Sequence, residues 1–325
     1  MIRILLLCLM FFHASFADEI RPAFLELTQK SETSYKVLWK KPSRGEAKSV
    51  LKVEPIFPTT AKMIGVKQIS KTRVAILESY VIEEPNALIA KTITIEGLET
   101  TSSDVLVRIH YLDGETEFIR VLPESPKFKL SHKSGFVNMA SMYFILGVEH
   151  ILEGFDHLLF ILALLLLVGN LHVLIWTITA FTLAHTITLM LASLDMIHLS
   201  SKAVEATIAL SIIFVAAEVV YAMKGKIHLS KKYPWLIAFA FGLIHGLGFA
   251  GALKEIGLPQ TEIVPSLIFF NVGVEVGQLI FISCVLLTIW IGRKFFENYA
   301  YNIKMATTYV IGITATLWFL ERVIV

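Results

Sequence analysis

The chain has 325 residues, of which 55% are apolar and only 17% are charged. Its mean hydropathy of +0.67 exceeds that of an ordinary soluble globular chain, so the composition predicts a polytopic membrane protein. The net charge of +2 gives no reason to expect a nucleic-acid partner.

Residues 1–17 are predicted to be a secretory signal peptide. Arg3 supplies the positive start, and the apolar core at 4–12 is too short to span a bilayer. Ser15 and Ala17 place small residues before a cleavage site at Asp18. An uncleaved anchor is the alternative. After cleavage the chain keeps one cysteine, Cys284, so no intrachain disulfide is expected.

Residues 18–133 are predicted to form a small antiparallel β-sandwich domain. Three short runs that alternate apolar with polar residues, at 36–39, 92–95 and 105–109, and a less regular one at 118–122 are predicted to be strands. Asp113 and Gly114 are typical of a hairpin turn between the last two runs. Because a signal peptide precedes it, this domain is expected outside the cytoplasm.

Residues 134–325 are predicted to be an all-α transmembrane bundle of about six helices. Most of the apolar runs have the roughly 20 residues that a bilayer requires. Gly154 is a candidate break in the first. The runs lie at about 139–168, 171–194, 199–223, 234–256, 263–291 and 303–324.

The distribution of basic residues predicts the orientation of this bundle. The segments 224–232 and 293–304 carry seven lysines and arginines, while the opposite loops and helix ends carry few. By the positive-inside rule these two segments are cytoplasmic. The β-domain and the C-terminus are then extracytoplasmic, as for a multi-pass protein of a bacterial-type inner or plasma membrane.

Seven ionisable residues lie in or at the edge of the apolar helices, where such groups are costly unless they are paired, face a bundle interior or hold an ion. The predicted topology places most of them in the middle and outer half of the bundle. Together they are our candidate metal-binding residues: His150, Asp156, His157, His185, Glu205, His245 and Glu275. Imidazole and carboxylate are ligands of nickel, cobalt and zinc ions.

Spacing within the first helix favours a shared site. His150 and His157 are two helical turns apart with Glu153 between them, so an unbroken helix would project all three from one face. If Gly154 breaks the helix, Asp156 and His157 instead cap the start of the second half and still face the bundle. A carboxylate beside a ligating histidine would also fix its tautomer.

A simpler interpretation is that these polar groups only join helices by hydrogen bonds. Asn271 and Gln278 flank Glu275 and are accessory polar residues under either interpretation. The histidines outside the apolar helices are treated as surface residues: His110, His132, His172, His198 and His228.

Five ordered blocks resemble the HupE/UreJ family, in its branch with an N-terminal extracytoplasmic domain. They lie at 147–160, 181–189, 204–211, 241–250 and 270–278 within a resemblance that covers about 139–325. The first holds the signature of His150, five residues, Asp156 and His157. The resemblance implies a nickel or cobalt permease. Its signature is one residue longer than that of the larger nickel/cobalt transporters, and Ile151 stands where shorter members often have proline.

Three classes of function follow. The first is a permease in which a divalent metal passes from His150, Asp156, His157 and His185 toward His245 and Glu275, with Glu205 as an outer gate or counter-charge. The second is an intramembrane zinc-dependent hydrolase, although the chain lacks an HExxH element. The third is a membrane-anchored assembly protein whose β-domain binds an extracytoplasmic partner. The permease is favoured, with no catalytic residue assigned.

Overall fold

The computed structural model describes residues 22–42, 52–71, 75–131, 135–194, 196–197, 199–226, 229–256 and 263–324. The predicted signal peptide and the domain limits at 18 and 133 lie outside these residues. So do three of the histidines expected at the surface, His132, His198 and His228.

The β-domain has two sheets in the described part of the chain. The strands are β1 (Ala23–Gln29), β2 (Ser34–Pro42), β3 (Glu54–Ile56), β4 (Lys62–Lys71), β5 (Ala75–Glu83), β6 (Thr92–Glu96), β7 (Val105–His110), β8 (Thr116–Val121) and β9 (Lys127–Lys129). A short 3₁₀ turn, η1 (Leu98–Thr100), follows β6. The six-stranded sheet has the order β4-β5-β2-β1-β7-β8, and the three-stranded sheet has the order β3-β6-β9.

The alternation of β2 explains how the two sheets pack. Tyr35, Val37 and Trp39 share one face of the strand and are fully buried in one cluster with Ile93 and Ile95 of the smaller sheet. The predicted strands are therefore present and form a sandwich. The predicted turn is also confirmed, because β7 and β8 pair antiparallel on either side of Gly114, whose φ is +86°.

One feature of the sandwich differs from the prediction. Strand β1 pairs with β7 in parallel, so the larger sheet is mixed rather than wholly antiparallel. This pairing joins residues about 80 positions apart in the sequence, and a strand pattern carries no information about the direction of such a distant partner.

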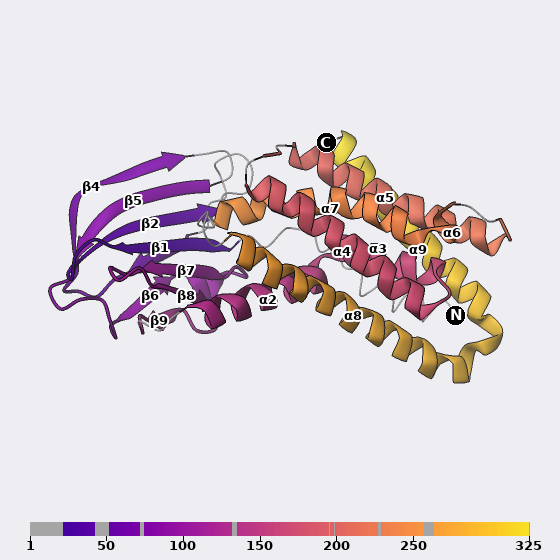
Figure 1. Cartoon of the computed structure of the whole chain (residues 1–325), viewed down its shortest axis with the longest axis horizontal. Helices are drawn as coiled ribbons and strands as arrows, with labels where there is room; N and C mark the ends of the chain where they lie inside the picture. Colours follow the sequence, from indigo (N-terminus) through magenta and orange to yellow (C-terminus); the bar gives the residue numbers. More distant parts are fainter. Residues whose placement is uncertain are drawn as a thin grey trace.

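The helical region consists of α2 (Phe136–Glu153), α3 (Phe155–Leu167), α4 (Leu171–Ser193), α5 (Ser201–Met223), α6 (Leu229–Lys232), α7 (Pro234–Ile256), α8 (Ile263–Phe296), the 3₁₀ turn η2 (Glu297–Tyr299) and α9 (Ala300–Ile324). In Figure 1 the sheets lie at one end of this bundle and α8 runs along it.

Among the described residues, four helices are long and apolar enough to cross a membrane: α4, α5, α8 up to Gly292, and α9. Helices α2 and α3 together make a fifth candidate, bent by 72°. In α7 the apolar stretch Pro234–Gly248 is shorter. The chain thus has the helices of a multi-pass membrane protein, while the number of six crossings and the orientation remain predictions.

Glycines bring two helix pairs into close contact. Helix α2 packs against α8, where Gly147 faces the carbonyl oxygen of Phe270 and Gly273 faces that of Phe144. Helix α4 packs against α7, where Gly242 and Gly246 face carbonyl oxygens of α4. In each case a Cβ atom would overlap the opposing backbone. Small residues permit this approach, which is a common mode of packing between membrane helices.

We expect Gly147→Ala and Gly273→Ala each to destabilise the protein by about 1–3 kcal/mol, because the added methyl group must force α2 and α8 apart. Gly292→Ala is the matched control on α8, since a Cβ atom there meets nothing within 4 Å. Thermal unfolding of the purified protein in detergent provides the comparison. Equal transition temperatures for the three variants would contradict this account of the α2–α8 contact.

Candidate metal centre

The break at Gly154 sets the geometry of the candidate site. Gly154 has φ −75° and ψ 90°, so the helix cannot continue through it, and α3 begins at Phe155. A Cβ atom at this position would lie 2.7 Å from His157 Nδ1 and 2.8 Å from the His150 carbonyl oxygen. The absence of a side chain thus lets the two histidines approach each other across the bend.

Asp156 lies in the first turn of α3, and its Oδ1 accepts a hydrogen bond from the His157 backbone amide at 2.8 Å. The break at Gly154 is therefore confirmed, and the interpretation with one unbroken helix face is wrong. Glu153, expected on that face, is exposed at the end of α2. The extended backbone at Gly154 rotates α3 relative to α2 and removes the shared face.

Three histidines from three helices converge. His150 of α2, His157 of α3 and His185 of α4 each offer a ring nitrogen, and these nitrogens all lie within 4.8 Å of one another. Ligand nitrogens around one tetrahedral ion lie about 3.4 Å apart, as follows from bond lengths of about 2.1 Å. At up to 4.8 Å apart the three nitrogens are further from one another than this, so the rings would have to move closer around a bound ion. We call these three residues the histidine group.

Hydrogen bonds fix the tautomers of two members of this group. Asp156 Oδ1 lies 2.9 Å from His157 Nδ1, so the carboxylate accepts that proton, and in the neutral ring Nε2 carries the lone pair. His185 Nδ1 lies 3.2 Å from Asn271 Oδ1. The Asn271 amide nitrogen donates to the Leu267 carbonyl at 2.8 Å, so its oxygen faces His185 and accepts from Nδ1.

His185 is fully buried, and its Nε2 has no hydrogen-bond partner among the residues that the structure describes. A buried imidazole whose acceptor nitrogen lacks a donor is costly unless another group fills the position. With the opposite nitrogen held by Asn271, His185 has the arrangement typical of a ligating histidine with a supporting contact.

His245 of α7 lies beside the histidine group. Its ring centroid is 5.2 Å from that of His157, and its Nε2 lies 3.0 Å from Ser211 Oγ of α5. The Ser211 hydroxyl donates to the Ile208 carbonyl at 2.6 Å, so it accepts from His245 Nε2. His245 Nδ1 is then the acceptor, and within the described chain it too is buried without a partner.

Polar contacts continue from His185 along α4 and α8. Thr182 donates to Gln278 Oε1 at 3.0 Å, and Thr179 donates to Glu275 Oε1 at 2.6 Å. We call this the polar seam, and define it as Thr179, Thr182, His185, Asn271, Glu275 and Gln278. It joins Glu275 to the histidine group through shared helices and not through direct contact.

Glu205 has a different partner. Its Oε2 accepts from Arg322 Nε of α9 at 3.0 Å. This ion pair joins α5 to α9, so Glu205 contacts the end of α9 and is not among the groups that gather around His157. Of the seven candidate residues, the structure thus brings together His150, Asp156, His157, His185 and His245, places Glu275 on the polar seam, and pairs Glu205 with Arg322.

Sequence reasoning missed the groups that hold these residues in place: Ser211, Thr179, Thr182 and Arg322. Two signals were available. Thr182 lies one helical turn before His185, and Ser211 is a hydroxyl residue inside an otherwise apolar run. Neither signal identifies the partner, because the partner depends on how the helices are rotated against each other.

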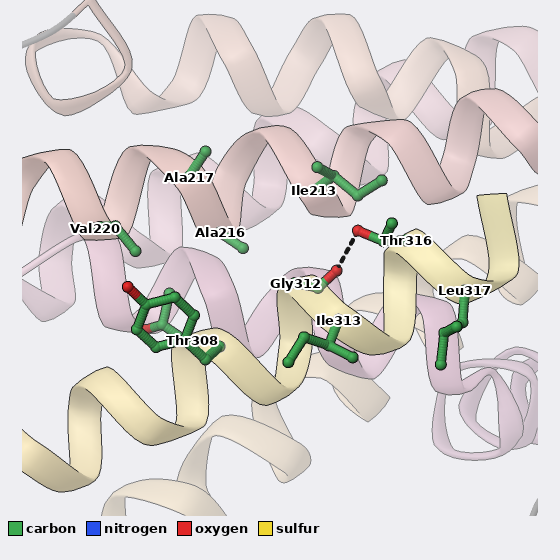
Figure 2. A pocket seen from close by; sticks show the side chains of 10 residues that line it. Ile213, Ala216, Ala217, Val220, Thr308, Gly312, Ile313, Thr316 and Leu317 are labelled. Atoms are coloured by element: carbon green, nitrogen blue, oxygen red, sulfur yellow. Dashed lines mark hydrogen bonds between the residues drawn. The ribbon is translucent and has the colours of Figure 1, made fainter. Parts of the chain in front are cut away.

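A separate apolar groove of about 330 Å³ lies between α5 and α9 (Figure 2). Its lining includes Ile213 and Ala216 on α5 and Gly312 and Leu317 on α9. The Thr316 hydroxyl in its wall donates to the Gly312 carbonyl at 2.7 Å. Among the residues that the structure describes, no histidine or carboxylate lines this groove, so it is not part of the candidate metal centre.

Comparison with known proteins identifies the helical region. A family model described as HupE / UreJ protein matches residues 127–322, from the start of β9 to the last turn of α9. No curated protein and no solved structure matches the chain.

The hydrogen bond from His185 to Asn271 leads to a prediction about affinity. We expect Asn271→Leu to weaken binding of Ni²⁺ by about 10- to 100-fold, because a supporting contact to a ligating histidine is lost. Ser283→Ala on the same helix is the control, since this residue is exposed and its hydroxyl donates to the Leu279 carbonyl of its own helix. Isothermal titration in detergent measures both. Unchanged affinity in Asn271→Leu would exclude this role for the residue.

Proposed function

The chain belongs to the HupE/UreJ family, and we propose that it is an integral membrane permease for a divalent transition metal of the nickel or cobalt type. The observation that carries this proposal is the histidine group, in which three helices bring ring nitrogens within 4.8 Å of one another. The resemblance stated for the five sequence blocks supports the same substrate class.

The donor set favours a transition metal over the hard cations. Neutral imidazole suits nickel, cobalt and zinc ions, whereas calcium and magnesium ions prefer sites made of oxygen ligands. In the proposed site His150, His157 and His185 are ligands to the ion. Asp156 supplies a negative charge and holds the proton of His157 on Nδ1.

The polar seam supports transport rather than storage. Helices α4 and α8 run in opposite directions, because His185 contacts Asn271 while Thr179, nearer the start of α4, contacts Glu275, further along α8. A conduction path needs several weak sites so that the ion can leave each one. We propose that the seam is such a path, with Glu275 as its second charged site.

Buried polar atoms along these two helices are consistent with a path. Gln278 is fully buried, and its Nε2 has no hydrogen-bond partner in the described part of the chain. At the end of α4 and near the start of α8, the hydroxyl oxygens of Ser193 and Ser266 are also buried. Neither has a hydrogen-bond partner among the described residues. Unsatisfied groups of this kind are expected where an ion or water passes.

The orientation is part of the proposal. The β-domain and the C-terminus are extracytoplasmic, and the basic segments 224–232 and 293–304 are cytoplasmic. A metal ion would then enter from the side of the β-domain, reach the histidine group, and continue along the seam past Glu275. His245 lies beside this route, where it can receive the ion from His157.

We expect His157→Ala to abolish accumulation of nickel or cobalt in cells that express the protein, because the ligand at the centre of the group is lost. His172→Ala is the matched control, since His172 is exposed at the start of α4 and accepts a hydrogen bond from Trp176. Cellular metal is measured by mass spectrometry at equal protein expression. Unchanged accumulation in His157→Ala would remove the motif from the mechanism.

Glu275→Gln tests the path separately from the first site. We expect metal affinity in detergent to stay within about twofold of wild type, while metal flux in proteoliposomes falls at least tenfold, because the second charge on the route is lost. Normal flux would exclude Glu275 from the path. An equal loss of affinity and flux would instead assign Glu275 to the first site.

An intramembrane zinc-dependent hydrolase is the second candidate function. Three histidines with a nearby carboxylate also match a catalytic zinc centre that keeps one position for water. Metal analysis of purified protein separates the two functions. Stoichiometric zinc that resists chelation, combined with lipid or peptide hydrolysis, would favour the enzyme, whereas exchangeable metal and flux favour the permease.

A further inference from the structure

The β-domain packs directly on the helix that carries His150. Phe118 of β8 and Leu106 of β7 belong to the same buried cluster as Met139 and Tyr143 of α2. At the start of α2, Gly135 lies so close to the carbonyl oxygen of Thr116 that a Cβ atom would overlap it. Strand β8 and helix α2 therefore form one contact surface and not two units joined only by a linker.

An arginine on β8 bridges this surface. Arg120 donates from Nη1 to Glu149 Oε1 at 3.0 Å and from Nη2 to Glu149 Oε2 at 2.6 Å. Its Nε donates to Asp104 Oδ2 at 2.5 Å. A bidentate pair between arginine and a carboxylate fixes the relative orientation of the two groups, which a single contact does not.

The environment of Arg120 keeps it charged. Its side chain is 20% exposed, and those of Asp104 and Glu149 are 15% and 36% exposed. Burial alone would lower the pKa of Arg120, but the hydrogen bonds to Glu149 and the charge of Asp104 outweigh burial and raise it. The guanidinium of Arg120 therefore stays charged across the physiological pH range.

Glu149 immediately precedes His150 in the last turn of α2. Successive residues of an α-helix point about 100° apart, so one side chain faces β8 while the other faces the histidine group. The same turn is restrained from a third direction, because Gly147 packs against the backbone of Phe270 on α8. A small rotation of this turn would move the His150 ring away from His157 and His185.

We propose that Arg120 is a positioning residue of the metal centre. Through its bidentate pair with Glu149, the β-domain holds the last turn of α2 in the orientation in which His150 binds the ion together with His157 and His185. This inference rests on the proposed function only in requiring that the histidine group binds a metal. It gives the β-domain a direct part in setting metal affinity.

The test uses the full-length protein in detergent with Co²⁺ as the probe, because its visible absorption reports the ligands around the ion. We expect Arg120→Gln and Glu149→Gln each to weaken Co²⁺ binding about tenfold and to change the spectrum of the bound ion, as loss of a supporting contact to a ligand does. The double variant is expected to be no weaker than either single variant, because both changes break the same link.

Two further variants separate positioning from stability. Asp104→Asn keeps the pair between Arg120 and Glu149 and is expected to bind Co²⁺ within about twofold of wild type. Arg120→Lys is expected to lie between wild type and Arg120→Gln, because lysine retains the charge but not the bidentate geometry. Thermal unfolding of every variant identifies any that fails to fold, and Glu149→Gln repeats the test from the helix side.

The outcomes are distinct. Wild-type affinity and spectrum in both Arg120→Gln and Glu149→Gln would overturn the positioning role and leave the proposed permease untouched. Equal losses in Asp104→Asn and Arg120→Gln would also overturn it, because the cause would then be a disturbed β-domain. If the variants behave as expected but proteoliposomes show no metal flux, the positioning role stands and the permease is excluded.

Discussion

The arrangement of the bundle depends on one constraint. Each ring nitrogen of a histidine buried among apolar helices needs a hydrogen-bond partner or a bound ion. Asp156 accepts a hydrogen bond from one ring nitrogen of His157. Asn271 does the same for His185, and Ser211 for His245. Each contact leaves the other nitrogen as an acceptor. Asp156 is on α3 like His157, but Asn271 joins α8 to α4 and Ser211 joins α5 to α7, so two of these hydrogen bonds also fix which helices surround the rings.

Close helix contacts supply the precision that such hydrogen bonds require. In the α2–α8 pair the ring centroids of His150 and Phe270 lie 5.4 Å apart, and in the α4–α7 pair Gly246, next to His245, faces the carbonyl oxygen of His185. Both contacts depend on glycines that face a carbonyl oxygen of the opposite helix. The glycines in the sequence blocks around these histidines are thus part of the site, although none of them offers a ligand.

Much of this was accessible from the sequence, and the limits have physical reasons. The break at Gly154, the strands and the β7–β8 turn follow from local patterns, whereas the expectation that His150, His157 and His185 lie together rests on their depths in the predicted topology. Three features follow from neither: the parallel pairing of β1 with β7, the pairing of Glu205 with Arg322, and the bond between Ser211 and His245. Each joins segments far apart in the chain, and its existence depends on strand direction or helix rotation, which residue type does not encode.

The bend at Gly154 brings two helix ends to this site, since α2 ends at Glu153 and α3 begins at Phe155. The first turn of a helix presents unsatisfied backbone N–H groups equivalent to roughly half a positive charge, and here that end lies next to His157. The last turn of α2, which carries His150, ends at the same bend and presents carbonyl oxygens of about the opposite charge, so the two helix ends largely offset each other there. The charge of Asp156 is then the main electrostatic attraction that the bend offers to the metal ion of the proposed permease, so a single side chain sets how firmly this part of the span would hold it.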